Sequence, residues 1–218
     1  MSIRIRFDRP IRFALAVATM LACLPSLAIA ADGLTEPQQV VASVHEQLTS
    51  VLRRDRGRLR DDPGYVNRIV DEIFVPHLDV NGVSALVLGR YWRTATPDQK
   101  EGFIRELKRL LIQTYSTALI EIGVEQWDMV FLPPREIQGK TKRVVVRTQI
   151  VRAGAKPASI DFSMRYDGKQ WLTYDVKVEG VSLLANYRSS FSRMAAEKGL
   201  DGLIADLTAR NDAHRQGS

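Results

Sequence analysis

Three short motifs in this chain contain the residue types of known catalytic or phosphate-binding loops. Gly82-Val-Ser84 and Gly180-Val-Ser182 begin like the turn that presents a nucleophilic serine, but Leu86 and Leu184 stand where that turn needs its second glycine. Gly139-Lys140-Thr141 resembles the end of a phosphate-binding loop, but the first glycine of such a loop is missing and a strand pattern follows. Because none of the three motifs is complete, the sequence predicts neither a serine nucleophile nor a nucleotide site.

The histidines and cysteine have no spacing typical of a metal site. His45, His77 and His214 lie far apart, and Cys23 is the only cysteine. A metal site needs several such ligands close together, so we expect none.

The carboxylates give no sign of acid–base catalysis. Asp161, Asp175 and Glu179 alternate with apolar residues and are expected on the outer face of a sheet, and Asp79 is expected to cap a helix. An isomerase-like enzyme, the main enzymatic alternative, would need a carboxylate inside an apolar pocket with a raised pKa.

The first thirty residues have the three parts of a secretory signal. A positive head is followed by an apolar run from Phe13 to Leu24 and by the small residues of a cleavage site, Ala28-Ile29-Ala30. The run is shorter than the roughly 20 apolar residues of a membrane-spanning helix. We therefore expect cleavage after Ala30, export to the periplasm, and a single domain over residues 31–218. The alternative is a lipoprotein acylated at Cys23, but Met20 and Leu21 make a poor recognition sequence for that modification.

Basic residues are concentrated in two segments beyond this signal. The chain has 31 Lys and Arg against 25 Asp and Glu, and four of the arginines and one aspartate lie in the first thirty residues. The net charge of +6 therefore falls to +3 in the mature protein, with clusters at residues 53–60 and 140–143. We interpret both clusters as solvated helix ends and hairpin tips, and contact with anionic lipid head groups or an acidic partner is the functional alternative. An exported protein is not expected to bind nucleic acid.

Apolar residues recur with helical period over residues 37–122. Two helices are expected over about 37–52 and 62–74, and a third, short one over 82–92. Thr96, Pro97 and Gln99 have the types and spacing of a capping box that opens the longest helix. In that helix we expect Phe103 and the residues in phase with it to face inward, and Glu106 to face outward with its charged neighbours.

The period changes to two after Gly123. Four segments, 127–131, 144–150, 159–166 and 172–178, alternate apolar and polar residues, and two further helices are expected around 181–194 and 203–207. An antiparallel sheet with one apolar face needs helices to cover that face. The sequence therefore predicts an α+β fold in which a curved four-stranded antiparallel sheet is covered by helices. The same period fits a tightly packed core and an apolar cavity.

One segment has an order of residues that is more specific than helix capping and core packing require. Leu86-Val-Leu-Gly-Arg-Tyr-Trp-Arg-Thr-Ala-Thr-Pro-Asp-Gln99 resembles the L-V-L-G-R-Y-W/Y-x-x-A-T-P-x-Q segment of the MlaC family, also called the toluene-tolerance Ttg2 family, of periplasmic phospholipid carriers. The segments 62–71, 75–79, 174–182 and 198–203 resemble family segments in the same order. The resemblance covers about residues 62–207.

The resemblance implies a nuclear-transport-factor-2-like cone whose apolar pocket holds phospholipid acyl chains. It also implies a monomeric carrier without a cofactor, rather than an enzyme. Such carriers shuttle phospholipid between an outer-membrane lipoprotein associated with a porin and an inner-membrane ABC transporter complex with an MCE-domain subunit, which maintains the asymmetry of the outer membrane. A lipid-free periplasmic adaptor that bridges membrane proteins is the third class of function.

We expect the pocket lining to come from the inward positions of the sheet and the helices. The expected lining residues are Val70, Phe74, Leu86, Tyr91, Phe103, Leu107, Leu110, Leu111, Met129, Phe131, Val146, Thr148, Ile150, Ile160, Phe162, Met164, Tyr174, Val176 and Leu184. Arg90 and Arg93 are candidate head-group contacts at the rim, and Arg90 is equally suited to hydrogen-bond helix carbonyls.

Overall fold

The computed structural model describes residues 34–216, apart from 122–126, 138–141 and 153. The predicted signal sequence, its cleavage site and Cys23 lie outside these residues. The chain separates into Met1–Gly33 and Leu34–Ser218, and every element described below belongs to the second unit. No helix in the described part combines the length and the apolar character that a membrane crossing requires.

The described part of the chain begins with three successive helices. They are α1 (Glu36–Arg54), α2 (Arg56–Asp61) and α3 (Pro63–Ile73), followed by the 3₁₀ turn η2 (Val75–His77). Both predicted starts are confirmed: Pro37 lies in the first turn of α1, and Asp62 accepts a hydrogen bond of 2.9 Å from the Tyr65 N–H in the first turn of α3. The arginine-rich segment, expected as a helix end, forms the short helix α2 as well.

A left-handed glycine splits the helix that was expected over 82–92. The helix α4 (Val80–Leu88) ends at Gly89, whose φ is +56°, and α5 (Arg90–Thr94) follows. Glycine adopts this φ without the Cβ clash that other residues meet. The longest helix, α6 (Pro97–Glu121), begins with the predicted capping box: Thr96 Oγ1 accepts from the Gln99 N–H at 3.2 Å, and Gln99 Oε1 accepts from the Thr96 N–H at 3.1 Å.

Among the described residues the sheet contains six strands, two more than the four predicted. The strands are β1 (Asp128–Phe131), β2 (Arg135–Ile137), β3 (Arg143–Val151), β4 (Ala158–Tyr166), β5 (Trp171–Val178) and β6 (Val181–Ser182). The order is β1-β3-β4-β5-β6, β2 also pairs with β3, and each of these pairs is antiparallel. β2 and β6 have three and two residues, which is too few for an alternating pattern to appear in the sequence.

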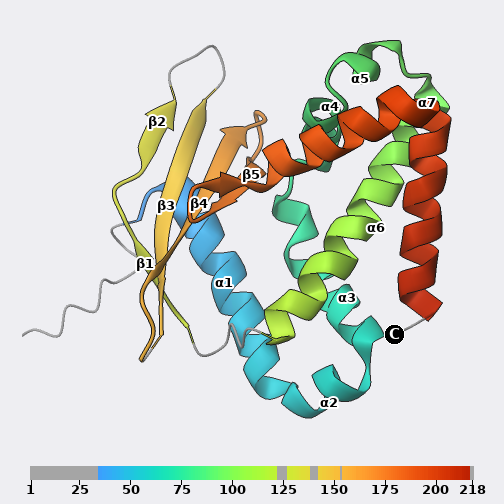
Figure 1. The fold of residues 1–218 in the computed structure, drawn as a ribbon. Coiled ribbons are helices and arrows are strands. Elements are labelled where there is room, and N and C mark those ends of the chain that lie inside the picture. Colours follow the sequence, from blue (N-terminus) through green and yellow to red (C-terminus); the bar gives the residue numbers. More distant parts are fainter. Residues whose placement is uncertain (1–33, 122–126, 138–141, 153, 217–218) are drawn as a thin grey trace, which may run out of the picture. The chain divides into compact units, whose positions relative to one another are not determined.

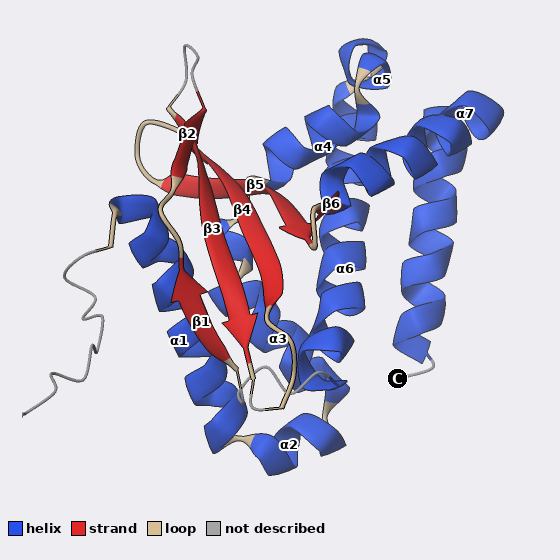
Figure 2. Cartoon of the chain, turned by 60° about the vertical axis from the view of Figure 1, so that its left-hand side comes forward, coloured by secondary structure: helices blue, strands red, loops and turns tan. Residues whose placement is uncertain are grey.

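A β-bulge lies between β4 and β5. Ser163 pairs with Asp175 while Met164 pairs with Thr173, so Tyr174 is an extra residue without a partner on β4. Bulges increase the local twist and bend the strand. Figure 2 shows β5 turned well away from the direction of β3 and β4. Thr173, not Tyr174, stands opposite Met164, so the alternation predicted for residues 172–178 fails at this point.

The last helix covers two of the predicted ones. α7 (Leu183–Gln216) is bent at Gly199, where φ is +72°, and its two arms correspond to the helices expected around 181–194 and 203–207. Figure 1 shows the sheet as one layer and the helices on one side of it, with the second arm of α7 running beside α6. The predicted α+β fold with an antiparallel sheet and covering helices is confirmed.

Candidate functional site

Nine of the residues expected to line a pocket lie on one face of the sheet. Strand partners share a face, and Met129 pairs with Ile150, Phe131 with Thr148, Val146 with Phe162, Thr148 with Ile160, and Phe162 with Val176. Met164 lies on the same face, two residues along β4 from Phe162. The shared face predicted within residues 127–131, 144–150 and 159–166 is therefore confirmed, and Val176 on β5 lies on it as well.

This face is not evenly covered. Val146 and Met164 are 0% exposed, and α1 packs over them through Val41. Phe162 is only half-buried, and Val178 at the end of β5 is 42% exposed. The apolar face is thus sealed beneath α1 and becomes more accessible toward β5 and β6.

Tyr174 does not join these nine residues. Its ring centroid lies 5.9 Å from the guanidinium carbon of Arg143. Arg143 neighbours Val144, which pairs with Met164, and therefore points to the other face of β3. The bulge separates Tyr174 from the other predicted sheet residues.

The predicted residues of the long helix belong to a second buried cluster. Phe103 and Leu107 are 0% exposed, and the Phe103 ring meets the Phe191 ring edge-on at 5.9 Å between centroids. The other members are Val87, Leu88, Phe191, Ala195, Leu203 and Leu207, from α4 and α7. Four predicted residues, Tyr91, Leu110, Leu111 and Leu184, are half-buried and pack against this cluster.

The remaining predicted residues lie on α3 and α4. Val70 is 3% exposed, Phe74 at the end of α3 is half-buried, and Leu86 on α4 is 41% exposed. Leu86 is therefore more accessible than an inward-facing residue of a sealed core would be.

The buried apolar residues of the described part fall into separate clusters. The sheet cluster around Val146 and Met164 shares no residue with the helical cluster around Phe103, and a third cluster joins α1, α2 and α3 around Leu52. Domains usually have one contiguous core with smaller satellites. Half-buried side chains such as Phe162 and Leu184 pack at the margins of the first two clusters and stay partly exposed.

The two predicted rim residues lie on α5 and are exposed. The Arg90 guanidinium lies 4.9 Å from the centroid of the Tyr91 ring and donates a hydrogen bond of 2.9 Å to the Tyr91 hydroxyl. Arg90 therefore has a local aromatic partner, and Arg93 lies in the last turn of the same helix.

Two open hollows in the surface lie elsewhere. One, of about 650 Å³, lies between the start of α6 and the second arm of α7 and includes Gln99, Arg105 and Asp201. The other, of about 500 Å³, lies on α1 and includes Arg53 and Arg54. Most of the side chains that line them are polar, and neither hollow contains a predicted lining residue, so they do not suit an apolar ligand.

A comparison with models of protein families identifies the family of this chain. The model of the family described as "MlaC protein" matches residues 42–209. The chain belongs to the MlaC family.

Individual relatives agree with this family. The Intermembrane phospholipid transport system binding protein MlaC of Haemophilus influenzae is 24% identical over 176 residues, covering 79% of this chain and 81% of the relative. The Toluene tolerance protein ttg2D of Pseudomonas putida is 25% identical over 183 residues, covering 84% and 82%. A phospholipid-binding protein from Ralstonia solanacearum, solved in complex with a phospholipid, has a TM-score of 0.74 and 26% identity, covering 83% of this chain and 99% of that one.

Asp175 of this MlaC-family chain is buried, although an outer position was expected. It is 9% exposed because the start of α7 folds over it. Its carboxylate accepts hydrogen bonds from the Ser182 hydroxyl at 2.8 Å and from the Leu184 N–H at 3.0 Å. Asp175 and Ser182 therefore cap the first turn of α7, which gives the Gly180-Val-Ser182 motif a structural explanation.

Asp79 has the capping role that was expected. It is 5% exposed, and its Oδ1 accepts from the Gly82 N–H at 2.9 Å. Oδ2 forms an ion pair with Arg165 Nε, without the alignment of a hydrogen bond. The Ser84 hydroxyl in the other glycine–serine motif donates to the Val80 carbonyl at 2.8 Å. The start of α4 is thereby capped by Asp79 and tied to β4 through Arg165.

The two described histidine side chains, His45 and His77, both have a pKa below the ordinary value. Burial lowers the pKa of His77, and its Nδ1 has no hydrogen-bond partner among the described residues. Burial, and then the charge of Arg53, lowers the pKa of His45. The His214 side chain lies outside the described residues. Within the described ranges, no group of three or more His, Cys, Asp or Glu is placed to hold a metal ion.

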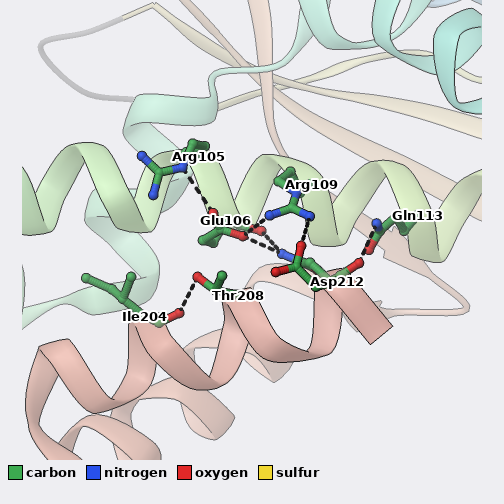
Figure 3. Close-up of polar contacts among 8 residues, drawn as sticks. Arg105, Glu106, Arg109, Gln113, Ile204, Thr208 and Asp212 are labelled. Carbon is green, nitrogen blue, oxygen red and sulfur yellow. Dashed lines mark hydrogen bonds and ion pairs between the residues drawn. The ribbon is translucent and has the colours of Figure 1, made fainter. Parts of the chain in front are cut away.

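Glu106 is 1% exposed, so the outward position expected for it is wrong. The second arm of α7 covers this side of α6, as Figure 3 shows. The carboxylate accepts hydrogen bonds from Arg105 at 3.0 Å, Arg109 at 2.9 Å and the Asn211 amide at 3.0 Å. Burial by itself raises the pKa of Glu106, but the Asn211 hydrogen bond and the two arginines outweigh it and lower that pKa below its ordinary value.

Sequence reasoning missed one polar pair beside the predicted lining. The hydroxyls of Tyr115 on α6 and Tyr187 on α7 lie 3.4 Å apart, and both residues are half-buried. Helical spacing could have pointed to them, because Tyr115 follows Leu111 by four residues and Tyr187 follows Leu184 by three.

Proposed function

We propose that this chain is a periplasmic phospholipid-binding shuttle that carries phospholipid between the outer and inner membranes. The observation that carries the proposal is its likeness to the Ralstonia solanacearum protein that was solved with a phospholipid bound. The similarity spans 99% of that protein at 26% identity, and the printed name of the Haemophilus influenzae relative is that of a phospholipid transport binding protein.

The acyl chains would lie between the sheet and the helices α4, α6 and α7. The separate apolar clusters support this location, because lipid chains would supply the contacts that join the sheet cluster to the helical one. The walls would be half-buried side chains of both layers, such as Phe162 on β4 and Leu110 and Leu184 at the edge of the helical cluster. The nuclear-transport-factor-2-like cone is part of this proposal.

Transfer energetics favour such a carrier without any catalytic group. Burying about 30 methylenes from water at roughly 0.8 kcal/mol each would exceed any measured non-covalent affinity. The true starting state is a bilayer, where the same methylenes are already in hydrocarbon. The hydrophobic difference between membrane and protein is therefore small, and modest contacts decide whether lipid enters or leaves.

The buried carboxylates support transport rather than catalysis. An isomerase-like enzyme on this fold would need a carboxylate with a raised pKa facing the apolar space. In the described part of the chain the buried carboxylates are Asp79, Asp175 and Glu106. Each is held by helix-capping or ion-pair partners, and the pKa of Glu106 is lowered.

The membrane partners of this proposal come from the family. They are an inner-membrane ABC transporter complex with an MCE-domain subunit and an outer-membrane lipoprotein–porin complex, reached from the periplasm after removal of residues 1–30. Such a carrier would act as a monomer with phospholipid as its cargo and no cofactor.

Transfer between vesicles tests the shuttle directly. Donor vesicles with labelled phospholipid and denser acceptor vesicles are mixed with the purified mature protein and then separated by centrifugation. The proposal expects labelled phospholipid first on the protein and then in the acceptors, in proportion to protein concentration. An entrapped dye that stays in the donors excludes fusion. A lipid-free adaptor would leave the label in the donor vesicles.

A further inference from the structure

Tyr115 and Tyr187 form the only hydroxyl pair that bridges α6 and α7 in the described part of the chain. Tyr187 packs against the helical cluster, with its ring centroid 5.6 Å from that of Phe191. Their hydroxyls are 3.4 Å apart, which is longer than an ordinary O–H···O hydrogen bond of about 2.5–3.0 Å.

The pair has a spare donor. Two hydroxyls carry two hydrogens, and their mutual contact uses one. Neither hydroxyl makes another hydrogen bond to a described residue. Other buried hydroxyls are already used: Ser116, next to Tyr115 in the sequence, donates to the Ile112 carbonyl at 2.6 Å, and Thr148 in the sheet donates to the Ile160 carbonyl at 2.7 Å.

The spacing of the two hydroxyls suits one shared acceptor. An oxygen about 2.7–2.8 Å from each hydroxyl forms a triangle with the 3.4 Å separation as its base. A carbonyl oxygen has two lone pairs and can accept from both donors. The exchange replaces one long hydroxyl–hydroxyl contact by two short hydrogen bonds.

A phospholipid has such an acceptor where its chains meet its head. The ester carbonyls are acceptors without a donor, and burying one unpaired is unfavourable. Tyr187 lies one turn beyond Leu184, and Tyr115 one turn beyond Leu111, so each tyrosine lies beside a half-buried apolar residue of its own helix.

We propose that Tyr115 and Tyr187 together bind an ester carbonyl of the phospholipid and thereby fix how deep the lipid sits. This inference rests on the proposed function and adds a polar contact that recognises the glycerol ester rather than the chains or the phosphate. Burial, followed by the hydrogen bond with Tyr187, raises the pKa of Tyr115, so its hydroxyl remains a donor at physiological pH.

The test compares two lipids that differ only in this acceptor. The mature protein is equilibrated with vesicles containing equal amounts of a diester phosphatidylglycerol and its diether analogue with the same chains, and native mass spectrometry gives the ratio of the two bound lipids. The variants are Tyr115→Phe, Tyr187→Phe and the double variant. Tyr166→Phe is the matched control, because Tyr166 lies at the far end of β4 against Trp171.

Wild type and Tyr166→Phe should prefer the diester by about 2- to 12-fold, the equivalent of one net hydrogen bond of about 0.5–1.5 kcal/mol. The double variant should bind both lipids equally, and each single variant should lie between. The ratio is measured within each variant, so a general loss of affinity or stability does not change it.

The inference is overturned if the double variant keeps the wild-type preference for the diester, or if wild type shows no such preference. Either result leaves the proposed carrier function standing. If the double variant does not fold, Tyr187→Phe replaces it, and an unchanged preference for the diester in that variant overturns the inference. Wild-type protein that takes up neither lipid overturns the proposed function and the inference with it.

Discussion

Phe162 and Met164 lie two residues apart on the same face of β4, so one substitution made at each position distinguishes a cavity from a packed core. Met164 is 0% exposed and packs with Val41 and Val146, so Met164→Trp must force extra volume into a filled site. Overpacking of this kind costs about 1–3 kcal/mol. At roughly 2–4 °C per kcal/mol for a domain of this size, the melting temperature should fall by about 2–12 °C.

Phe162→Trp should have the opposite result. Phe162 is half-buried, so the larger ring can extend into the space assigned to acyl chains. The melting temperature should then change little. A clash of about 1.4 kcal/mol with the lipid would lower its affinity tenfold.

Two measurements on each variant distinguish a cavity from a packed core. They are the amount of phospholipid per protein after purification and the melting temperature in the lipid-free state. The reasoning is refuted if Phe162→Trp keeps its lipid and melts as low as Met164→Trp, because Phe162 would then belong to a packed core.

Three further predictions concern stability and processing. Replacing Glu106 by Gln should cost about 1–3 kcal/mol in urea unfolding, against almost nothing for the exposed Glu101→Gln. Folding lowers the pKa of Glu106, so the ionised carboxylate stabilises the folded protein fully above its ordinary pKa, and this stabilisation is lost as the pH falls from there through the folded pKa. The unfolding free energies of wild type and Glu106→Gln should therefore converge in acid. A constant difference down to the lowest pH at which both proteins fold would contradict this. Gly89→Ala should destabilise the folded protein by about 1–2 kcal/mol because the φ of Gly89 is +56°. Gly57→Ala in α2 should instead stabilise it by up to about 1 kcal/mol. Equal changes of the unfolding free energy in urea would show that the backbone angle does not matter. The exported protein should have the intact mass of a chain beginning at Ala31, and the mass of a lipid-modified cysteine terminus would contradict the predicted cleavage.

Local signals in the sequence were sufficient wherever local chemistry decides the structure. Thr96 and Gln99 hydrogen-bond each other's backbone N–H across three residues, so their spacing predicted the start of α6, although the Gln99 amide also donates to Asp201 on α7. The alternation over β3 and β4 likewise predicted which residues share a face, because pleating is a property of each strand.

Long-range packing explains what the sequence did not predict. The burial of Glu106 depends on the second arm of α7, about a hundred residues later in the chain. The bulge at Tyr174 interrupts an alternation that looks regular in the sequence. Asp175 is buried because the chain reverses at β6 and returns over it as α7.

The alternation of apolar and polar residues could not show which inward-facing residues line the proposed pocket. Val146, Met164 and Phe162 have the same period and the same face, yet only Phe162 is half-buried. That difference is set by where α1 lies across the sheet, which no alternation encodes.

Native mass spectrometry of the freshly purified mature protein tests the central claim most directly. We expect a mass above that of the polypeptide by one or more phospholipids, which collision activation releases as intact lipid ions. A protein that carries no lipid from the cell, and takes up none from phospholipid vesicles, would contradict it.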